Sequence, residues 1–246
     1  MTAIIGLVLL LLILPLVLFL TLRLRSGEMR ASLRPLPGMD ELPSSVGRSA
    51  ETGQPLHVSI GVGGVGGAAT AETWAGLTVL AQLADDAAAC STPLIVSVAD
   101  PTVLPLAQDI LRRAYARHGN LDHYDLTQVR FVAPEPTAYA AGVMGILERE
   151  PLTSNIMIGS FGDEYLLMGE VGARRQVPQV VGVADPRTLP FAEATADEVL
   201  VGEEMFAGGA YTSRLPVQIA SLLTEDWLRW GVVAAIFIFA VVKIVL

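Results

Sequence analysis

The chain has 246 residues, 52% of them hydrophobic and 17% charged, with 16 basic and 25 acidic residues and a net charge of −9. Its only lysine, Lys243, lies in an apolar run at the carboxyl end, and an acidic, lysine-free middle excludes the charge pattern of a nucleic-acid-binding protein. A single cysteine and three histidines predict neither an internal disulfide nor a zinc site. We expect Cys90 to be a buried, small apolar residue near the end of a helix.

An uncharged apolar run opens the chain over residues 3–22. As a helix it would be about 30 Å long, which matches the apolar thickness of a bilayer, and Pro15 is tolerated in such a helix. A cleaved signal peptide is the alternative, but no basic residue precedes the run. The run is followed by arginines at Arg23, Arg25, Arg30 and Arg34. This order of charges predicts a transmembrane helix with its amino terminus outside and the next segment in the cytoplasm.

A second apolar run closes the chain over residues 231–246. Trp227 and Trp230 are typical interfacial anchors, and Arg229 suits the cytoplasmic headgroups. Lys243 is close enough to the end to reach the far surface of the bilayer. A helix lying flat in the interface is the alternative, but the run is apolar on every face, which favours insertion. Both termini are therefore expected outside.

A proline-rich linker precedes the central domain. Residues 24–55 are rich in proline, glycine and serine, and we expect Pro35, Pro37 and Pro43 to break any helix there. The sequence thus predicts an N-terminal transmembrane helix (1–23), this linker (24–55), a cytoplasmic domain (56–226) and a C-terminal transmembrane helix (227–246).

Short β-branched runs alternate with longer helical runs from His57 onward. Strands such as 95–98 show no polar alternation, which is typical of strands buried on both faces. Strands are predicted over 58–62, 94–99, 129–133, 155–160, 180–184 and 198–201, and helices over 70–89, 105–118, 137–150, 164–175 and from 190. This alternation predicts an α/β fold, a Rossmann-like and mostly parallel sheet with helices on both faces, flanked by one transmembrane helix at each end.

One segment of the chain recurs. Residues 96–107 (VSVADPTVLPLA) and 181–192 (VGVADPRTLPFA) are identical at eight of twelve positions. We interpret the repeat as a recurrent strand-to-helix device, in which the aspartate accepts N–H groups of the following turn and the second proline starts the helix.

Ligands of parallel sheets bind outside the carboxyl ends of the strands. The candidate binding residues at this edge are Gly61, Gly63, Gly64, Gly66, Gly67, Thr70, Asp100, Ser160, Asp163 and Asp185.

The glycine-rich segment formally matches the dinucleotide fingerprint through Gly61, Gly63 and Gly66, so its N–H groups are candidates to hold a phosphate. The next helix is expected to begin late, near Thr70, and Asp100 lies 34 residues after Gly66 instead of about 20. The lysine and hydroxyl of a P-loop are missing. A loop that needs positive φ angles is the favoured interpretation and phosphate binding the alternative, so no cofactor is assigned.

The three aspartates have two interpretations. Asp100, Asp163 and Asp185 are candidates to hold Mg²⁺ or ribose hydroxyls, but capping of the following helix is favoured, so no metal ligand and no catalytic residue is assigned. Ser160 is similar to a nucleophile elbow but lacks the Gly-x-Ser-x-Gly spacing, and no histidine is expected at this edge, which disfavours a serine hydrolase.

Several motifs together resemble a known family. They are HVS at 57–59 with the glycine loop, AET at 71–73, ADPT at 99–102, AQDILRRAY at 107–115 and GEE at 202–204. Over nearly the whole chain they resemble an uncharacterised family of bacterial membrane-anchored proteins, known as a domain of unknown function. The resemblance implies a bacterial inner membrane and supplies no activity.

The predicted function is a membrane-anchored cytoplasmic binding or assembly module whose partners are the lipid bilayer and further copies of the chain. The alternative is a nucleotide- or metal-dependent enzyme that uses the carboxyl edge of the sheet.

Overall fold

The structure is a computed structural model that describes residues 2–26, 34–213 and 216–245. It divides into two compact units, an α/β unit over Pro35–Thr212 and a helical unit made of Met1–Arg34 and Ser213–Leu246. Arg30 of the predicted arginine cluster lies outside the described residues, as do the terminal residues Met1 and Leu246 of the predicted spans.

The α/β unit contains one sheet of six parallel strands, as predicted. The strands are β1 (Leu56–Gly61), β2 (Leu94–Val98), β3 (Val129–Phe131), β4 (Ser154–Ser160), β5 (Gln179–Val183) and β6 (Glu198–Val201). Their order across the sheet is β3-β2-β1-β4-β5-β6. The apolar side chains of the central strands are buried on both faces, which explains why their sequences show no polar alternation.

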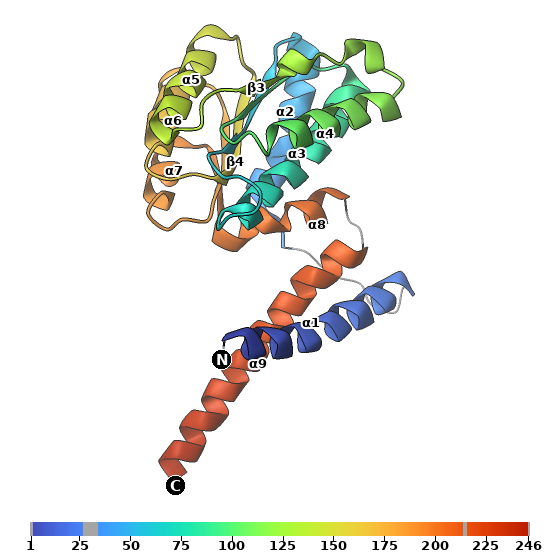
Figure 1. The fold of residues 1–246 in the computed structure, drawn as a ribbon, viewed down its shortest axis with the longest axis vertical. Helices are drawn as coiled ribbons and strands as arrows, with labels where there is room; N and C mark the ends of the chain where they lie inside the picture. Colours follow the sequence, from blue (N-terminus) through green and yellow to red (C-terminus); the bar gives the residue numbers. More distant parts are fainter. Residues whose placement is uncertain (1, 27–33, 214–215, 246) are drawn as a thin grey trace. The chain divides into compact units, whose positions relative to one another are not determined.

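Helices cover both faces of this sheet (Figure 1). One layer consists of α2 (Pro37–Thr52), α3 (Thr70–Cys90) and α4 (Leu104–Arg117). The other consists of α5 (Pro136–Arg149), α6 (Tyr165–Arg174) and α7 (Leu189–Thr195). The remaining short elements are the 3₁₀ helices η1 (Leu121–His123), η2 (Leu126–Gln128) and η3 (Gly202–Ala207), and α8 (Gly208–Ser213).

The prediction that prolines break every helix in the linker is wrong, because α2 occupies most of that segment and belongs to the α/β unit. Pro37 stands in the first turn, where no backbone N–H is needed. Pro43 lies inside the helix, at a cost of about 3 kcal/mol. Burial of Met39, Leu42 and Val46 along one stripe of α2 offsets this cost.

The expectation for Cys90 is also wrong, since this residue is exposed. It is the last residue of α3, and Ser91 after it adopts a left-handed conformation. The buried stripe of α3 ends at Ala87 and Ala88, so Cys90 falls just beyond the part of the helix that faces the sheet.

The two ends of the α/β unit lie at the same side of the sheet. Because α2 leads directly into the amino end of β1, its own start lies toward the carboxyl edge of the sheet, where β6 also ends. The packing agrees, since a Cβ on Gly38 would lie 3.0 Å from the side chain of Leu200, and one on Gly208 would lie 3.3 Å from Met39. The chain thus enters and leaves this unit at neighbouring points.

The helical unit consists of α1 (Thr2–Arg25) and α9 (Pro216–Val245), which contact one another. Among the described residues, no helix combines the length and the apolar character that crossing a membrane requires.

Candidate functional site

The strand order creates a switch point at the centre of the sheet. From β1 the chain proceeds outward to β2 and β3, and it then returns to β4 beside β1 and proceeds outward on the other side. In open α/β sheets the loops after the two central strands diverge and leave a crevice at the carboxyl edge. All ten candidate residues lie at this edge, but the structure brings them together in two separate groups.

The first group joins the glycine loop to the end of β4. Gly61 has a φ of 81°, and a Cβ at this position would overlap the carbonyl oxygen of Ser160. A Cβ on Gly63 would lie 2.8 Å from the Cβ of Ser160 and 2.6 Å from the hydroxyl of Thr73. The N–H of Val62 donates to the Ser160 carbonyl oxygen over 2.9 Å. These glycines therefore let the loop approach β4 closely, which is a packing role.

The same loop also contacts Asp100. A Cβ on Gly64 would overlap the Asp100 carboxylate. Asp100 accepts the N–H of Thr102 over 2.7 Å and also its hydroxyl, while the Thr102 hydroxyl accepts the N–H of Val65 over 3.1 Å. The carboxylate therefore stabilises the turn after β2 and, through Thr102, the tip of the glycine loop.

The end of the loop is held by its own residues. The N–H of Gly66 donates to the Thr70 hydroxyl over 2.9 Å, and that hydroxyl donates to the Gly67 carbonyl over 2.6 Å. Helix α3 begins at Thr70, as predicted, after Ala69, which provides no side-chain cap. The loop is longer than the tight turn of a dinucleotide fingerprint, and several of its N–H groups already have protein partners.

The second group lies after β4 and β5. The Asp185 carboxylate accepts the backbone N–H of Arg187 over 2.9 Å and forms an ion pair with its guanidinium over 2.8 Å. The hydrogen bond between these two side chains lowers the pKa of Asp185 and raises the pKa of Arg187, and the negative charge of Asp163 raises the pKa of Arg187 further. Asp163 itself lines a hollow at the start of α6.

Asp100 and Asp185, the aspartates of the recurrent segment, occupy matching places. Each follows a strand one removed from the centre, β2 on one side and β5 on the other, and each accepts the N–H group two residues later. This geometry is that of an Asx turn, as expected for the recurrent segment. The expectation that Asp100, Asp163 and Asp185 cap the following helices is wrong, because the N-cap residues of α4, α6 and α7 are Val103, Glu164 and Thr188, and none of these helices has a side-chain cap.

Carboxylates gather at this edge, in the connections after β2 to β6 and, after β1, in the first turn of α3. They are Glu72, Asp100, Glu135, Asp163, Glu164, Asp185, Glu203 and Glu204. Arg187 is the basic residue in these connections. Several of the carboxylates accept hydrogen bonds from backbone N–H groups. Glu135, for example, accepts the N–H of Ala138, and Glu164 accepts the N–H of Gly162. Within the described residues, no group of three or more potential metal ligands comes together.

The histidines lie elsewhere in the fold. His57 is fully buried in β1, His118 follows α4 and lies 3.2 Å from Asp85, and His123 lies on η1. None of these positions is at the carboxyl edge, which agrees with the expectation that Ser160 has no histidine base.

A buried polar layer between the sheet and α5 was not predicted. The ring of His57 lies 2.7 Å from Asn155 Oδ1 and 3.0 Å from Ser97 Oγ. The Tyr139 hydroxyl lies 2.9 Å from Ser97 Oγ and 2.7 Å from Ser59 Oγ. Parallel pairing of Ser59 with Ser97 and of His57 with Asn155 explains how the sheet brings these residues onto one face.

Burial changes the acidity of this layer. It lowers the pKa of His57 to about 4, a shift that the hydrogen bond with Asn155 only partly opposes. It raises the pKa of Tyr139 to about 12. Both groups are therefore neutral at neutral pH, and through Ser97, Ser59 and Asn155 they satisfy the hydrogen-bonding groups of this layer inside the core. The sequence signal for this buried layer was the presence of His57, Ser59 and Ser97 in otherwise apolar strands.

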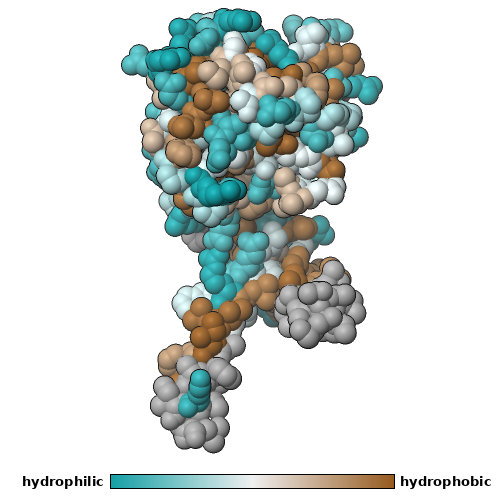
Figure 2. Space-filling view, turned by 60° about the vertical axis from the view of Figure 1, so that its left-hand side comes forward, coloured by the Kyte–Doolittle hydropathy of each residue, from teal (hydrophilic) through white to brown (hydrophobic). Residues whose placement is uncertain are grey.

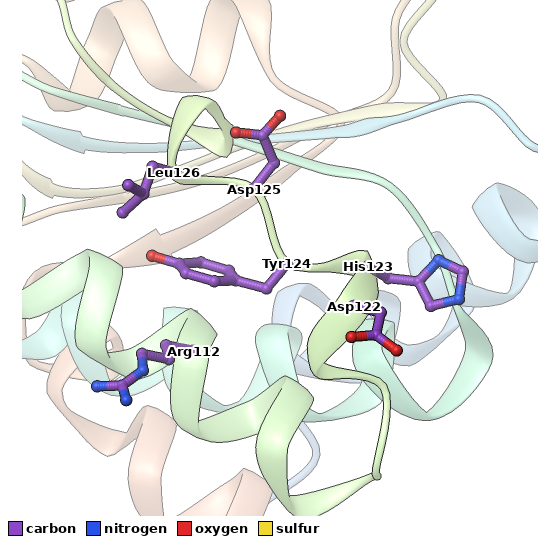
Figure 3. Close-up of a pocket in the computed structure, with 6 residues that line it drawn as sticks. All are labelled: Arg112, Asp122, His123, Tyr124, Asp125 and Leu126. Carbon is purple, nitrogen blue, oxygen red and sulfur yellow. The ribbon is translucent and has the colours of Figure 1, made fainter.

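A wide, open hollow lies beside the turns between α4 and β3. Its volume is about 790 Å³, and it is lined by Arg112, Asp122, His123, Tyr124, Asp125 and Leu126. Figure 3 shows the ring of Tyr124 between Leu126 and Arg112. The Tyr124 hydroxyl donates to the carbonyl of Gln108 over 3.2 Å, and Asp125 accepts the N–H of Thr127, so these polar groups stabilise the turns.

Comparison with known proteins identifies a family. No characterised protein and no solved structure matches the sequence. One family model, described as a domain of unknown function (DUF6754), matches residues 1–246. Because this match covers the entire chain, the protein belongs to the DUF6754 family.

Proposed function

We propose that this protein is a membrane-attached binding and assembly module, in which α1 and α9 insert into a bilayer and hold the α/β unit beside it. The observation that carries the proposal is the exposed apolar surface of the helical unit (Figure 2). On α1 the exposed side chains are Leu11, Leu14, Leu18, Phe19 and Leu22. On α9 they are Trp227, Trp230, Val232, Val233, Ile236, Phe237 and Val241.

Water is a poor environment for this surface. Phe237 is 69% exposed, Leu14 64% and Trp230 73%, and each fully buried side chain of this size gains about 1.5–3 kcal/mol. Contiguous apolar surfaces of this kind mark contacts with membranes or other proteins. The finding that no helix can cross a membrane applies to the described residues alone, and the predicted spans, 3–22 and 231–246, also contain many residues whose side chains lie outside them.

The arginines supply the proposed orientation. Arg23, Arg25 and Arg34 flank the first apolar run on its carboxyl side, and Arg229 precedes the second. Under the positive-inside rule the α/β unit is cytoplasmic and both termini are outside. The inner membrane of a bacterium is the location that the sequence resemblance implies. The carboxyl edge of the sheet, where α/β folds bind ligands, is also the edge at which the chain enters and leaves this unit.

Membrane attachment is tested with membranes from cells that express the full chain. We expect the protein to remain in the pellet after alkaline carbonate washing and to enter the supernatant only with detergent. Fusions of alkaline phosphatase and of green fluorescent protein at residue 35 test the orientation. A soluble protein would contradict the attachment, and a phosphatase-active fusion at residue 35 would contradict the orientation.

Assembly is tested by the mass of the detergent-solubilised full chain. The exposed faces of α1 and α9 allow close approach of further helices, for example at Gly231 and Ala234. We expect light scattering in a mild, uncharged detergent to give a multiple of 26.1 kDa after subtraction of the micelle. A strictly monomeric protein would contradict the assembly part of the proposal.

A nucleotide-dependent enzyme is the second candidate, because the strand order places the glycine loop at the switch point. The acidic edge and the contact of Gly64 with Asp100 favour the first candidate. Titration of the full chain with NAD(H), NADP(H), ATP and GTP decides between them. Micromolar binding that is lost on Gly63→Val with Gly66→Val would reverse the ranking.

A further inference from the structure

A groove lined by apolar and acidic side chains lies on the carboxyl edge of the sheet, on the side covered by α5 and α6. Its volume is about 460 Å³, and it is lined by Pro136, Thr137, Asp163, Glu164, Leu166 and Leu167. Leu166 is 39% exposed and Leu167 42%, although both belong to the first turn of a helix whose other large apolar side chains are mostly buried. Two adjacent leucines thus remain in contact with solvent.

The charge around this groove is strongly negative. The α/β unit contains nine arginines, no lysine and 22 acidic residues, a net charge of −13. Of the nine arginines, Arg187 alone lies in the connections at the carboxyl edge, and Asp185 neutralises it. Glu164 uses one carboxylate oxygen to accept the N–H of Gly162, and Asp163 is exposed. An anionic ligand, whether a phosphate or an acidic headgroup, is repelled by this surface.

We propose that this groove is the docking site for a basic amphipathic segment of a partner protein, an inference that rests on the proposed role as a binding module. Apolar side chains of the partner would cover Leu166 and Leu167, and its arginine or lysine side chains would face Asp163 and Glu164. Grooves that bind amphipathic helices combine these two features, and complementary charge accelerates the encounter.

The test uses a fluorescent peptide of about 14 residues with leucine on one helical face and arginine on the other. Its binding to the full chain in an uncharged detergent is followed by fluorescence anisotropy, with protein-free micelles as the blank. We expect saturable binding that weakens with salt, and no binding of the same peptide with glutamate in place of arginine.

A matched pair of double variants locates the site. Asp163→Asn with Glu164→Gln removes two charges from the groove, and we expect the Kd to rise at least tenfold. Glu148→Gln with Glu170→Gln removes two charges from α5 and α6 outside the groove, where both residues pair with Arg174, and we expect a change in Kd of less than twofold. Leu167→Ser should weaken binding without any change in charge.

Equal losses in both double variants, or failure of the native chain to bind the peptide, would overturn the proposal. Circular dichroism of each variant verifies that it is folded. Membrane attachment and mass are measured on the same samples, so a failed docking site is distinguished from a failed membrane module.

Discussion

Acidification is expected to destabilise the folded state through His57. Burial lowers the pKa of this side chain to about 4, whereas an exposed histidine in the unfolded chain titrates at 6.5. Between these values the unfolded chain binds a proton that the folded protein does not, so the free energy of unfolding falls as the pH falls. Each pH unit below 6.5 lowers the free energy of unfolding by about 1.4 kcal/mol. Acidification from about pH 7.5 to about pH 5 therefore lowers it by about 2 kcal/mol in total.

Other groups contribute little over this range. The carboxyls with lowered pKa values are Asp85, Asp125, Glu135 and Asp185. Their ordinary pKa values are 3.8 to 4.5, so their contributions to stability are lost mainly at lower pH. The loss that we attribute to His57 is therefore separable from general acid denaturation.

Urea unfolding of the full chain in an uncharged detergent, followed by far-UV circular dichroism at several pH values, measures the effect. His57→Gln removes the titrating group and should abolish most of the pH dependence above about pH 5, whatever it costs in absolute stability. His123→Gln replaces an exposed histidine and should preserve the pH dependence of the native protein. An unchanged pH dependence in His57→Gln would refute the reasoning.

Three further outcomes follow from single contacts. Gly64→Ala should cost about 1–3 kcal/mol because its Cβ would overlap the Asp100 carboxylate, whereas Gly67→Ala, where a Cβ meets nothing within 4 Å, should change the urea stability by less than about 0.5 kcal/mol. Tyr139→Phe should cost about 1–3 kcal/mol in the same assay, since it removes the hydroxyl that the buried Ser59 side chain bonds to and one of the two partners of the Ser97 hydroxyl. Cys90 should react with a maleimide as completely in the native protein as in urea, and protection in the folded state would contradict its exposed position.

The pattern of strands and helices was predictable because it depends on local hydrophobic periodicity. Buried runs such as 95–98 have to be covered on both faces, and this requirement alone implies a parallel sheet with two helical layers. Helix α2 escaped prediction because its two prolines suggested a break, while the apolar stripe of Met39, Leu42 and Val46 became meaningful only against β5 and β6. Tertiary packing overrode the local signal.

The candidate site was predictable as a location but not as a set of contacts. The edge itself follows from strand direction, so Asp100, Ser160 and Asp185 were placed correctly at the carboxyl end. Which residues meet depends on strand order, because only the pairing of β1 with β4 brings the glycine loop onto Ser160. The layer around His57 depends in addition on strand register, which no single segment of sequence encodes.

The strand order of this fold is shared with dinucleotide-binding proteins, so the difference in function that we propose has to arise from the edge of the sheet. In the dinucleotide fold, the glycine loop leaves its N–H groups and the helix end open to a pyrophosphate. Here the loop approaches a carboxylate at Gly64, and other N–H groups of the loop bond to Thr102 and Thr70. The carboxylates gathered at this edge then give it a charge opposite to the one a phosphate requires. The same topology is thereby suited to a cationic partner, and the groove beside Leu166 and Leu167 supplies the apolar surface that such a partner would bury.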